Sequence, residues 1–198
     1  MNTLKVQKRD MAKKAKELRR EGFVTGTVFG KELNGSIPVV IEKKEAERIH
    51  RECFKGSQLY VELGGKKYDV LLKEVDYDAM KRQILEMDFQ ALVKGEKVHS
   101  VAEIVLHNKE KVQEGILEQL LEELAYKATP ENLVERIDID CTGWKIGDVI
   151  KVSDLEIAKN DKIDITTHMD SVVASVLAPK NEEPEATETA ADDAQAKA

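Results

Sequence analysis

The sequence predicts a mainly β protein with short helices, built as a small N-terminal β-barrel, a second β-rich domain and a disordered acidic tail. Short β-branched and aromatic runs recur between glycine-rich and polar turns, which is typical of small barrels and rolled sheets. A polar joint, Lys94-Gly95-Glu96, separates two such series. After Pro179 the chain has no aromatic residue and no aliphatic residue larger than alanine, so this segment cannot offset its ordering entropy by burial. We therefore expect domains at residues 1–93 and 94–180 and a tail at 181–198.

The first 93 residues predict about six strands and two helices. In the first helix, expected over residues 10–22, Asp10 can cap the start, apolar residues recur at helical spacing, and Gly22 ends the helix. The second is expected over residues 42–53. Gly64-Gly65 between two β-rich runs predicts a hairpin. The strands are expected at 4–9, 23–30, 36–44, 58–63, 66–77 and 83–93.

The second half predicts further strands and one ambiguous segment. Residues 115–128, "GILEQLLEELAYKA", carry leucines at helical spacing, and strict alternation fails. The pattern alone therefore predicts a helix there. A short helix can start at "TPENL", and a turn framed by two glycines follows. The strands are expected at 101–106, 134–140, 148–157, 162–166 and 171–179.

Charge is divided unevenly along the chain. The protein has 31 Lys and Arg against 38 Asp and Glu, a net charge of −7. Residues 1–93 carry +4, residues 94–180 carry −6, and residues 181–198 carry −5. Within the first 31 residues, nine basic residues face three acidic ones. The front of the chain therefore has the sign that a polyanionic partner requires.

The sequence lacks the motifs typical of catalytic sites, metal sites and membrane-spanning segments. Four histidines show no metal-binding spacing, and His50 with Cys53 supplies only two ligands. No nucleophile elbow or phosphate-binding loop is present. Cys53 and Cys141 are expected to be reduced, buried thiols. We expect no enzyme, no cofactor, no membrane segment and no secretory signal, and hence a cytoplasmic protein.

The basic residues near the N-terminus are the candidates for binding RNA. Phosphates are held by lysine and arginine, whereas the wide minor groove of RNA offers 2′-hydroxyls to polar groups. A solvent-exposed helix face is the alternative explanation for the cluster within residues 13–20. A second basic pair, Lys81-Arg82, precedes the strand expected at 83–93. One positive face would result if loops gathered the following residues: Arg9, Arg19, Arg20, Lys73 and Arg82.

Three stretches give the sequence a family resemblance. "LRREGFVTGTVFG" (18–30), "EMDFQAL" (86–92) and "ENLVERIDIDCTGWKIGDVIKVSDLEI" (131–157) occur in this order. Together they resemble the bacterial large-subunit ribosomal proteins of the general stress protein CTC type, which bind 5S rRNA. The resemblance extends to about residue 179. It implies an N-terminal barrel on 5S rRNA, a mostly β C-terminal domain, and a strand rather than a helix within 115–128, which is the assignment we adopt.

The resemblance also implies particular RNA contacts. Phe29 stands where the family has tyrosine, Glu86 where it has histidine, and Thr25 where it has proline. The loss of a hydroxyl donor and the gain of a carboxylate alter the contact chemistry. The residues expected to bind RNA are Arg9, Lys13, Lys14, Arg19, Arg20, Phe29, Gly30, Lys73, Arg82, Glu86 and Asp88.

The expected function is therefore that of a ribosomal protein on the large subunit. Its expected partners are 5S rRNA and neighbouring large-subunit ribosomal proteins, with a monomer off the ribosome. The alternative is a protein–protein adaptor that acts through the acidic C-terminal domain, with RNA binding weakened by Phe29 and Glu86. An unrecognised enzyme is the second alternative. Binding of 5S rRNA separates the ribosomal function from the adaptor.

Overall fold

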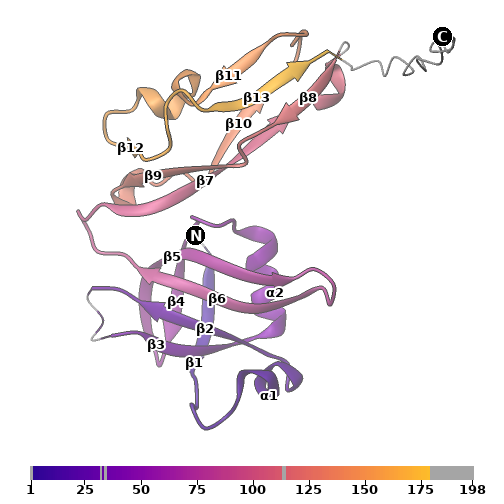
Figure 1. Ribbon diagram of the computed structural model, residues 1–198. Helices are drawn as coiled ribbons and strands as arrows, with labels where there is room; N and C mark the ends of the chain where they lie inside the picture. Colours follow the sequence, from indigo (N-terminus) through magenta and orange to yellow (C-terminus); the bar gives the residue numbers. More distant parts are fainter. Residues whose placement is uncertain (1, 32, 34, 113–114, 179–198) are drawn as a thin grey trace, which may run out of the picture.

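The computed structural model describes residues 2–31, 33, 35–112 and 115–178. The acidic segment 181–198, expected to be disordered, lies outside the described residues. The chain forms a closed β-barrel followed by two smaller sheets (Figure 1). The expectation of a mainly β protein with short helices is confirmed.

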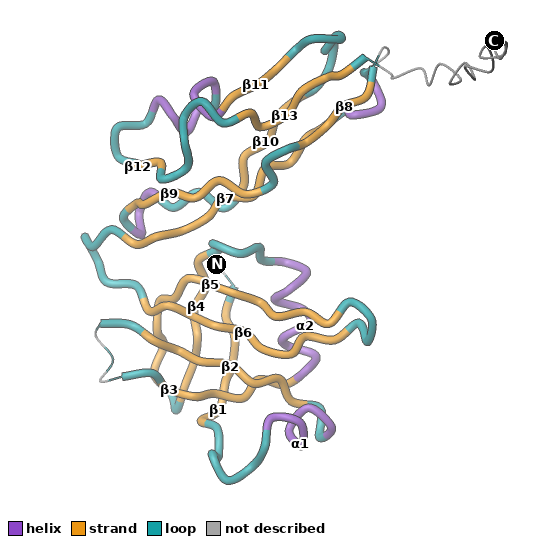
Figure 2. The backbone as a smooth tube through the Cα atoms, viewed as in Figure 1, coloured by secondary structure: helices purple, strands orange, loops and turns teal. Residues whose placement is uncertain are grey.

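The barrel has the strand order β1-β3-β2-β6-β5-β4 (Figure 2). β1 is parallel to β4 and β2 is parallel to β6, and the other neighbours are antiparallel. All six strands contribute side chains to the interior, most of them aliphatic and at alternate positions along the strand. The strands are β1 (Thr3–Lys8), β2 (Phe23–Phe29), β3 (Ile37–Glu42), β4 (Gln58–Leu63), β5 (Lys66–Asp78) and β6 (Gln83–Ala91).

Both predicted helices of the barrel half are present. α2 (Lys43–Glu52) buries Ala46 and Ile49 in the barrel core, as its spacing predicts. The expected hairpin joins β4 to β5, and Gly64 and Gly65 both have positive φ, which a two-residue turn of this kind requires.

The first helix is shorter than predicted. α1 spans only Ala15–Arg20, although Gly22 ends it as expected, with φ +90°. The Asp10 carboxylate accepts a hydrogen bond from the Ala12 N–H at 2.9 Å, which favours a tight turn over a helix start. Met11 is 68% exposed, so no burial supports a helix there. The prediction of a helix from residue 10 was wrong for residues 10–14.

The second half contains a four-stranded sheet, β10-β7-β9-β12, and a three-stranded sheet, β11-β13-β8. A core of aliphatic side chains lies between them and includes the fully buried Tyr126, whose hydroxyl bonds the backbone of Val134. The strands are β7 (Val98–His107), β8 (Ile116–Gln119), β9 (Glu123–Ala128), β10 (Arg136–Asp140), β11 (Val149–Lys151), β12 (Asp164–Ile165) and β13 (Val172–Leu177).

The ambiguous segment 115–128 forms two strands. β8 pairs with β13, and β9 pairs with β7, so sheet pairing overrides the helical spacing of the leucines. Leu120, which the helical pattern would bury, is 56% exposed between the two strands. The strand assignment is confirmed.

Two expected strands are much shorter than predicted. In place of a strand over 148–157, β11 ends at Lys151, because the Asp154 carboxylate accepts a bond from the Lys151 N–H at 3.0 Å. Short 3₁₀ turns follow, η3 (Val152–Asp154) and η4 (Glu156–Lys159). A third turn of this kind, η2 (Pro130–Asn132), forms at the expected "TPENL", and η1 (Lys109–Lys111) was not predicted. The strand expected at 162–166 is reduced to the two residues of β12.

Several contacts join the two halves. Leu71, Leu92 and Val98 are buried together. Lys55 and Glu123 form an ion pair at 3.1 Å. The division of the chain into domains at residues 93 and 94 stays a prediction, because a shared interface does not decide whether each half folds alone.

Candidate nucleic-acid interface

The register of the barrel defines a polar outer face on three adjacent strands. Val24 and Val28 of β2 and Met87 and Phe89 of β6 point into the core. The residues between them therefore point outward. Strand pairing aligns Thr25 with Glu86, Thr27 with Asp88 and Phe29 with Gln90, and aligns Glu74 and Asp76 of β5 with the two β6 carboxylates. We call this set the outer face: Thr25, Thr27, Phe29, Glu74, Asp76, Glu86, Asp88 and Gln90.

α1 fixes an arginine at one end of the outer face. The Arg19 guanidinium donates from Nη1 to the Leu85 carbonyl at 3.3 Å. The Thr25 hydroxyl donates to the same carbonyl at 3.2 Å, and Thr25 is 1% exposed. α1 therefore lies over the start of β2 and β6. Arg20, the next residue, is exposed and available for an anion.

The two lysines that precede α1 differ from each other. Lys13 pairs with Glu21 at 3.1 Å. The hydrogen bond from Lys13 to this carboxylate is the main reason that the pKa of Lys13 lies above its usual value. Lys14 is exposed at the position that precedes the helix. Lys13 thus has an internal partner that a phosphate would have to replace.

Arg9 lies at the same level as the centre of the outer face. Its N–H donates to the Pro38 carbonyl at 3.0 Å, and Pro38 is aligned with Thr27 across β3 and β2. Among the described residues, the buried Arg9 Nε finds no hydrogen-bond acceptor. A buried guanidinium nitrogen without a partner is costly and is satisfied by an incoming acceptor.

Asp88, on the outer face, lies at the same level of the barrel as Arg9 and also has a buried atom without a partner among the residues that the structure describes. Its Oδ1 is buried and has no hydrogen-bond donor within the described part of the chain. Burial is the main cause that raises the pKa of Asp88; Glu74 raises it further, and hydrogen bonding from Thr27 partly offsets both. The carboxyl therefore has an unsatisfied acceptor, and a base amino group or a 2′-hydroxyl is a donor of the kind that would satisfy it.

The five basic residues proposed to form one face are not all near each other. Arg82 is exposed in the β5–β6 turn with φ +50°, three residues before the Leu85 that Arg19 contacts. Lys73 lies farther along the hairpin, roughly 15–20 Å away at about 3.3 Å per strand residue. Its Nζ donates to the His99 carbonyl at 3.0 Å, so it is directed toward the second half.

Phe29 and Gly30 end β2. Phe29 is half-buried on the outer face and offers a ring without a polar group. A Cβ at Gly30 would lie 2.7 Å from the Ala91 Cβ, so close packing of β2 on β6 requires glycine there. The structure gives Gly30 a packing role, and its contact with RNA stays a prediction.

The residues expected to bind RNA leave out five members of the outer face: Thr25, Thr27, Glu74, Asp76 and Gln90. They are ordinary polar residues of predicted strands. Only the parallel register of β2 and β6 brings Thr27 beside Asp88, and no local signal in the sequence reveals a pairing between strands about 60 residues apart.

The described residues contain no group of three or more His, Cys, Asp or Glu that could hold a metal ion. The described helices include none long and apolar enough to span a membrane. Cys53 and Cys141 are free and buried, which confirms that expectation. Burial raises the pKa of both thiols.

The two halves of the chain, the barrel and the β-rich half that follows it, each match a family model of ribosomal proteins. The Ribosomal L25p family model matches residues 4–89. The model for the C-terminal domain of ribosomal protein TL5 matches residues 97–180. Neither match alone covers the chain, but together they cover nearly all of it outside the tail.

Relatives of this chain from several bacteria are named "Large ribosomal subunit protein bL25". The chain is 30% identical to that of Bacillus velezensis, over 92% of this chain and 91% of the relative. It is 31% identical to that of Dictyoglomus thermophilum, over 93% of each. It is 31% identical to that of Listeria monocytogenes, over 94% and 91%. The chain belongs to the bL25 family, in the long form that carries a TL5-type C-terminal domain.

Proposed function

We propose that this protein is a structural component of the large ribosomal subunit and binds 5S rRNA through the outer face of its barrel. Family membership supports the ribosomal role, a cytoplasmic location on the ribosome and the expectation that the chain is not an enzyme. The choice of 5S rRNA rests on the family resemblance of the N-terminal barrel. No match favours an adaptor without a ribosomal role.

The observation that carries the RNA contact is the row Arg9, Thr27 and Asp88 at one level of the barrel. Arg9 offers a buried donor, Nε, and Asp88 a buried acceptor, Oδ1, and neither of these two atoms has a hydrogen-bond partner among the described residues. Arg19 and Arg20 flank the row from α1. Arginines at its edges hold phosphates, while the carboxylate accepts from a base or a 2′-hydroxyl in the groove.

The proposal is tested with full-length protein and 5S rRNA in a filter-binding assay at fixed salt. Asp88→Asn replaces a charged acceptor by a neutral one, and hydrogen bonds to charged groups are about twice as strong, so binding should weaken about tenfold. Asp161→Asn is the matched control, since Asp161 is exposed and outside the barrel. An unrelated structured RNA of similar length tests specificity.

The proposal fails if wild-type protein binds 5S rRNA no better than the unrelated RNA. The placement of the site fails if Asp88→Asn and Asp161→Asn bind 5S rRNA equally well. We also propose that the protein contacts neighbouring large-subunit ribosomal proteins, and that it is a monomer when it is not bound to the ribosome. Sedimentation of the purified protein tests the monomer.

A further inference from the structure

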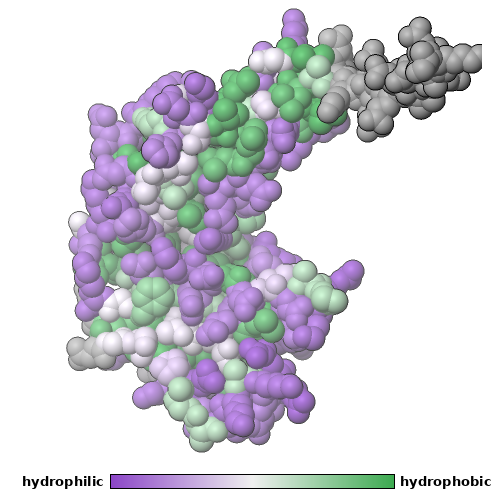
Figure 3. Space-filling model, viewed as in Figure 1, coloured by the Kyte–Doolittle hydropathy of each residue, from purple (hydrophilic) through white to green (hydrophobic). Residues whose placement is uncertain are grey.

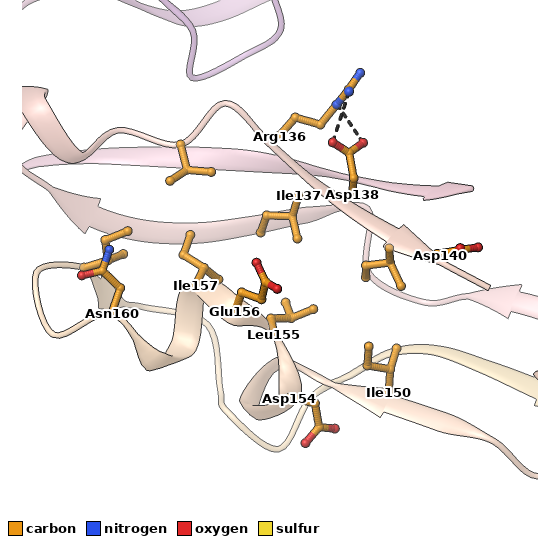
Figure 4. A pocket seen from close by; sticks show the side chains of 13 residues that line it. Arg136, Ile137, Asp138, Asp140, Ile150, Asp154, Leu155, Glu156, Ile157 and Asn160 are labelled. Carbon is orange, nitrogen blue, oxygen red and sulfur yellow. Dashed lines mark hydrogen bonds and ion pairs between the residues drawn. The ribbon is translucent and has the colours of Figure 1, made fainter. Parts of the chain in front are cut away.

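The second half of the chain contains a groove that the RNA-binding proposal does not use. It has a volume of about 610 Å³ and runs along β10, with β11 and the turns η3 and η4 on its other side (Figure 4). Its walls are aliphatic, including Ile137, Ile150 and Ile157. Hydrophobic side chains also come to the surface over β11 and β13, whereas the barrel surface is mostly hydrophilic in the same view (Figure 3).

β10 presents an open edge to this groove. Among the described strands it pairs with β7 alone. The Glu103 N–H donates to the Glu135 carbonyl, and the Cys141 N–H donates to the His107 carbonyl. With the observed parallel register, these bonds direct the backbone groups of residues 137 and 139 toward β7. The N–H and C=O groups of residues 136, 138 and 140 therefore point away from β7, to the open edge.

The strand on the other side of the groove, β11, is also an edge strand, in the three-stranded sheet. Ile150 of β11 lines the groove opposite β10. Two edge strands of one half thus face each other across an aliphatic cavity. Five residues of β10 give an edge roughly 17 Å long at about 3.3 Å per residue.

The rim of the groove is acidic. Asp138, Asp140, Asp154 and Glu156 line it with a single guanidinium, that of Arg136, a formal charge of −3. Arg136 is engaged by Asp138 at 2.9 Å (Figure 4). Hydrogen bonds from Thr142 and Asn108 lower the pKa of Asp140 to about 2, so this carboxylate stays charged.

We propose that this groove binds an extended, basic segment of a partner protein, which adds as a strand to the open edge of β10. Backbone bonds to a sheet edge supply affinity, and alternate side chains supply specificity. Side chains of the added strand that point inward meet the isoleucines of the groove. Those that point outward meet Asp138 and Asp140. The matching segment therefore alternates aliphatic and basic residues over about five positions.

A labelled peptide, Gly-Lys-Val-Lys-Val-Lys-Gly, tests this by fluorescence anisotropy with the full chain. The control peptide has proline in place of both valines, which keeps the charge but removes two N–H donors and cannot join a sheet. The valine peptide should bind saturably and the proline peptide at least about tenfold more weakly, as expected for lost ladder bonds.

Two protein variants separate the groove from general electrostatics. Glu156→Lys reverses a rim charge and should weaken peptide binding about twofold to fivefold, as expected for exposed ion pairs. Glu131→Lys makes the same change in net charge at an exposed site outside the groove and should leave binding unchanged. Circular dichroism confirms that both variants fold.

Hydrogen exchange locates the bound strand. The amides of Arg136, Asp138 and Asp140 should become protected by the valine peptide, whereas those of Ile137 and Ile139, already bonded to β7, should change little. No saturable binding up to millimolar peptide, equal binding of the two peptides, or equal weakening by both variants overturns the proposal. In each of those cases, the acidic residues on the rim of the groove would serve only to keep the open edge of β10 from pairing with strands of other chains.

Discussion

Arg20→Ala should reduce the salt dependence of 5S rRNA binding without changing the stability of the barrel. Arg20 is exposed, and a surface change of this kind alters stability by roughly 0.5 kcal/mol or less. If the guanidinium holds one phosphate, the slope of log K against log salt should fall by about 0.7–0.9. Affinity at low salt should fall with it.

Arg19→Ala should act on both RNA binding and stability. Its bond to the Leu85 carbonyl would be lost, but the Thr25 hydroxyl still donates to that carbonyl, so no buried acceptor is left alone. The loss should therefore be about 0.5–1.5 kcal/mol, with a further contribution from packing of the aliphatic stem. The double variant should flatten the slope by up to about 1.5.

The assay is filter binding of 5S rRNA over a range of salt, together with urea unfolding of each variant. Arg51→Ala is the matched control, because Arg51 is an exposed arginine on α2 and is not part of the outer face. If Arg20→Ala retains the wild-type affinity and slope while folded, α1 is a solvent-exposed basic surface. The assignment of phosphate contacts to α1 would then be refuted.

Three further predictions concern the barrel. Gly26→Ala places a Cβ 2.4 Å from the Met87 carbonyl oxygen, so urea unfolding should show a loss of about 1–3 kcal/mol or more, and an unchanged midpoint would contradict the β2–β6 spacing. Burial raises the pKa of Asp88 in the folded state above its value in the unfolded state, so the charge on this carboxylate opposes folding. Asp88→Asn should therefore be more stable than the wild-type protein at pH 7. This difference in stability should vanish as the pH falls below about 4, where the carboxyl becomes protonated in both states. The fragment 1–93 should unfold cooperatively in calorimetry and retain the 5S rRNA affinity, and stronger binding by 94–180 would reverse the domain assignment.

Local patterns in the sequence predict most of the barrel. The alternation of its strands, the Gly64-Gly65 turn and the spacing of Ala46 and Ile49 on α2 each depend on neighbouring residues. The start of α1 was misjudged, because Asp10 can cap either a helix or a tight turn, and only the exposure of Met11 in the folded chain decides between them.

Features that depend on residues far apart in the sequence could not be predicted from local patterns. Leucines at helical spacing within 115–128 form β8 and β9, because β13 and β7 supply strand partners that a local pattern cannot contain. The RNA-binding candidates show the same limit. Arg19 and Asp88 came from motifs, but the separation of Lys73 from Arg82 and the alignment of Thr27 with Asp88 follow from strand register alone.

The mixture of charges on the outer face leads to a last prediction. A uniformly positive face would bind any RNA in proportion to its phosphate contacts, and that binding falls steeply with salt. Here arginines flank carboxylates, those of Glu86 and Asp88 among them. Phosphates over the carboxylates are repelled, so only an RNA that directs base or 2′-hydroxyl donors at Glu86 and Asp88 gains from them. Such hydrogen bonds release no counterions. For an unrelated RNA with as many phosphate contacts, the ratio of the affinity for 5S rRNA to that for the unrelated RNA should therefore exceed one and stay constant between about 50 and 200 mM salt, while both affinities fall. A ratio near one across this range would mean that phosphate contacts alone account for binding, and that the carboxylates of the outer face do not contact RNA.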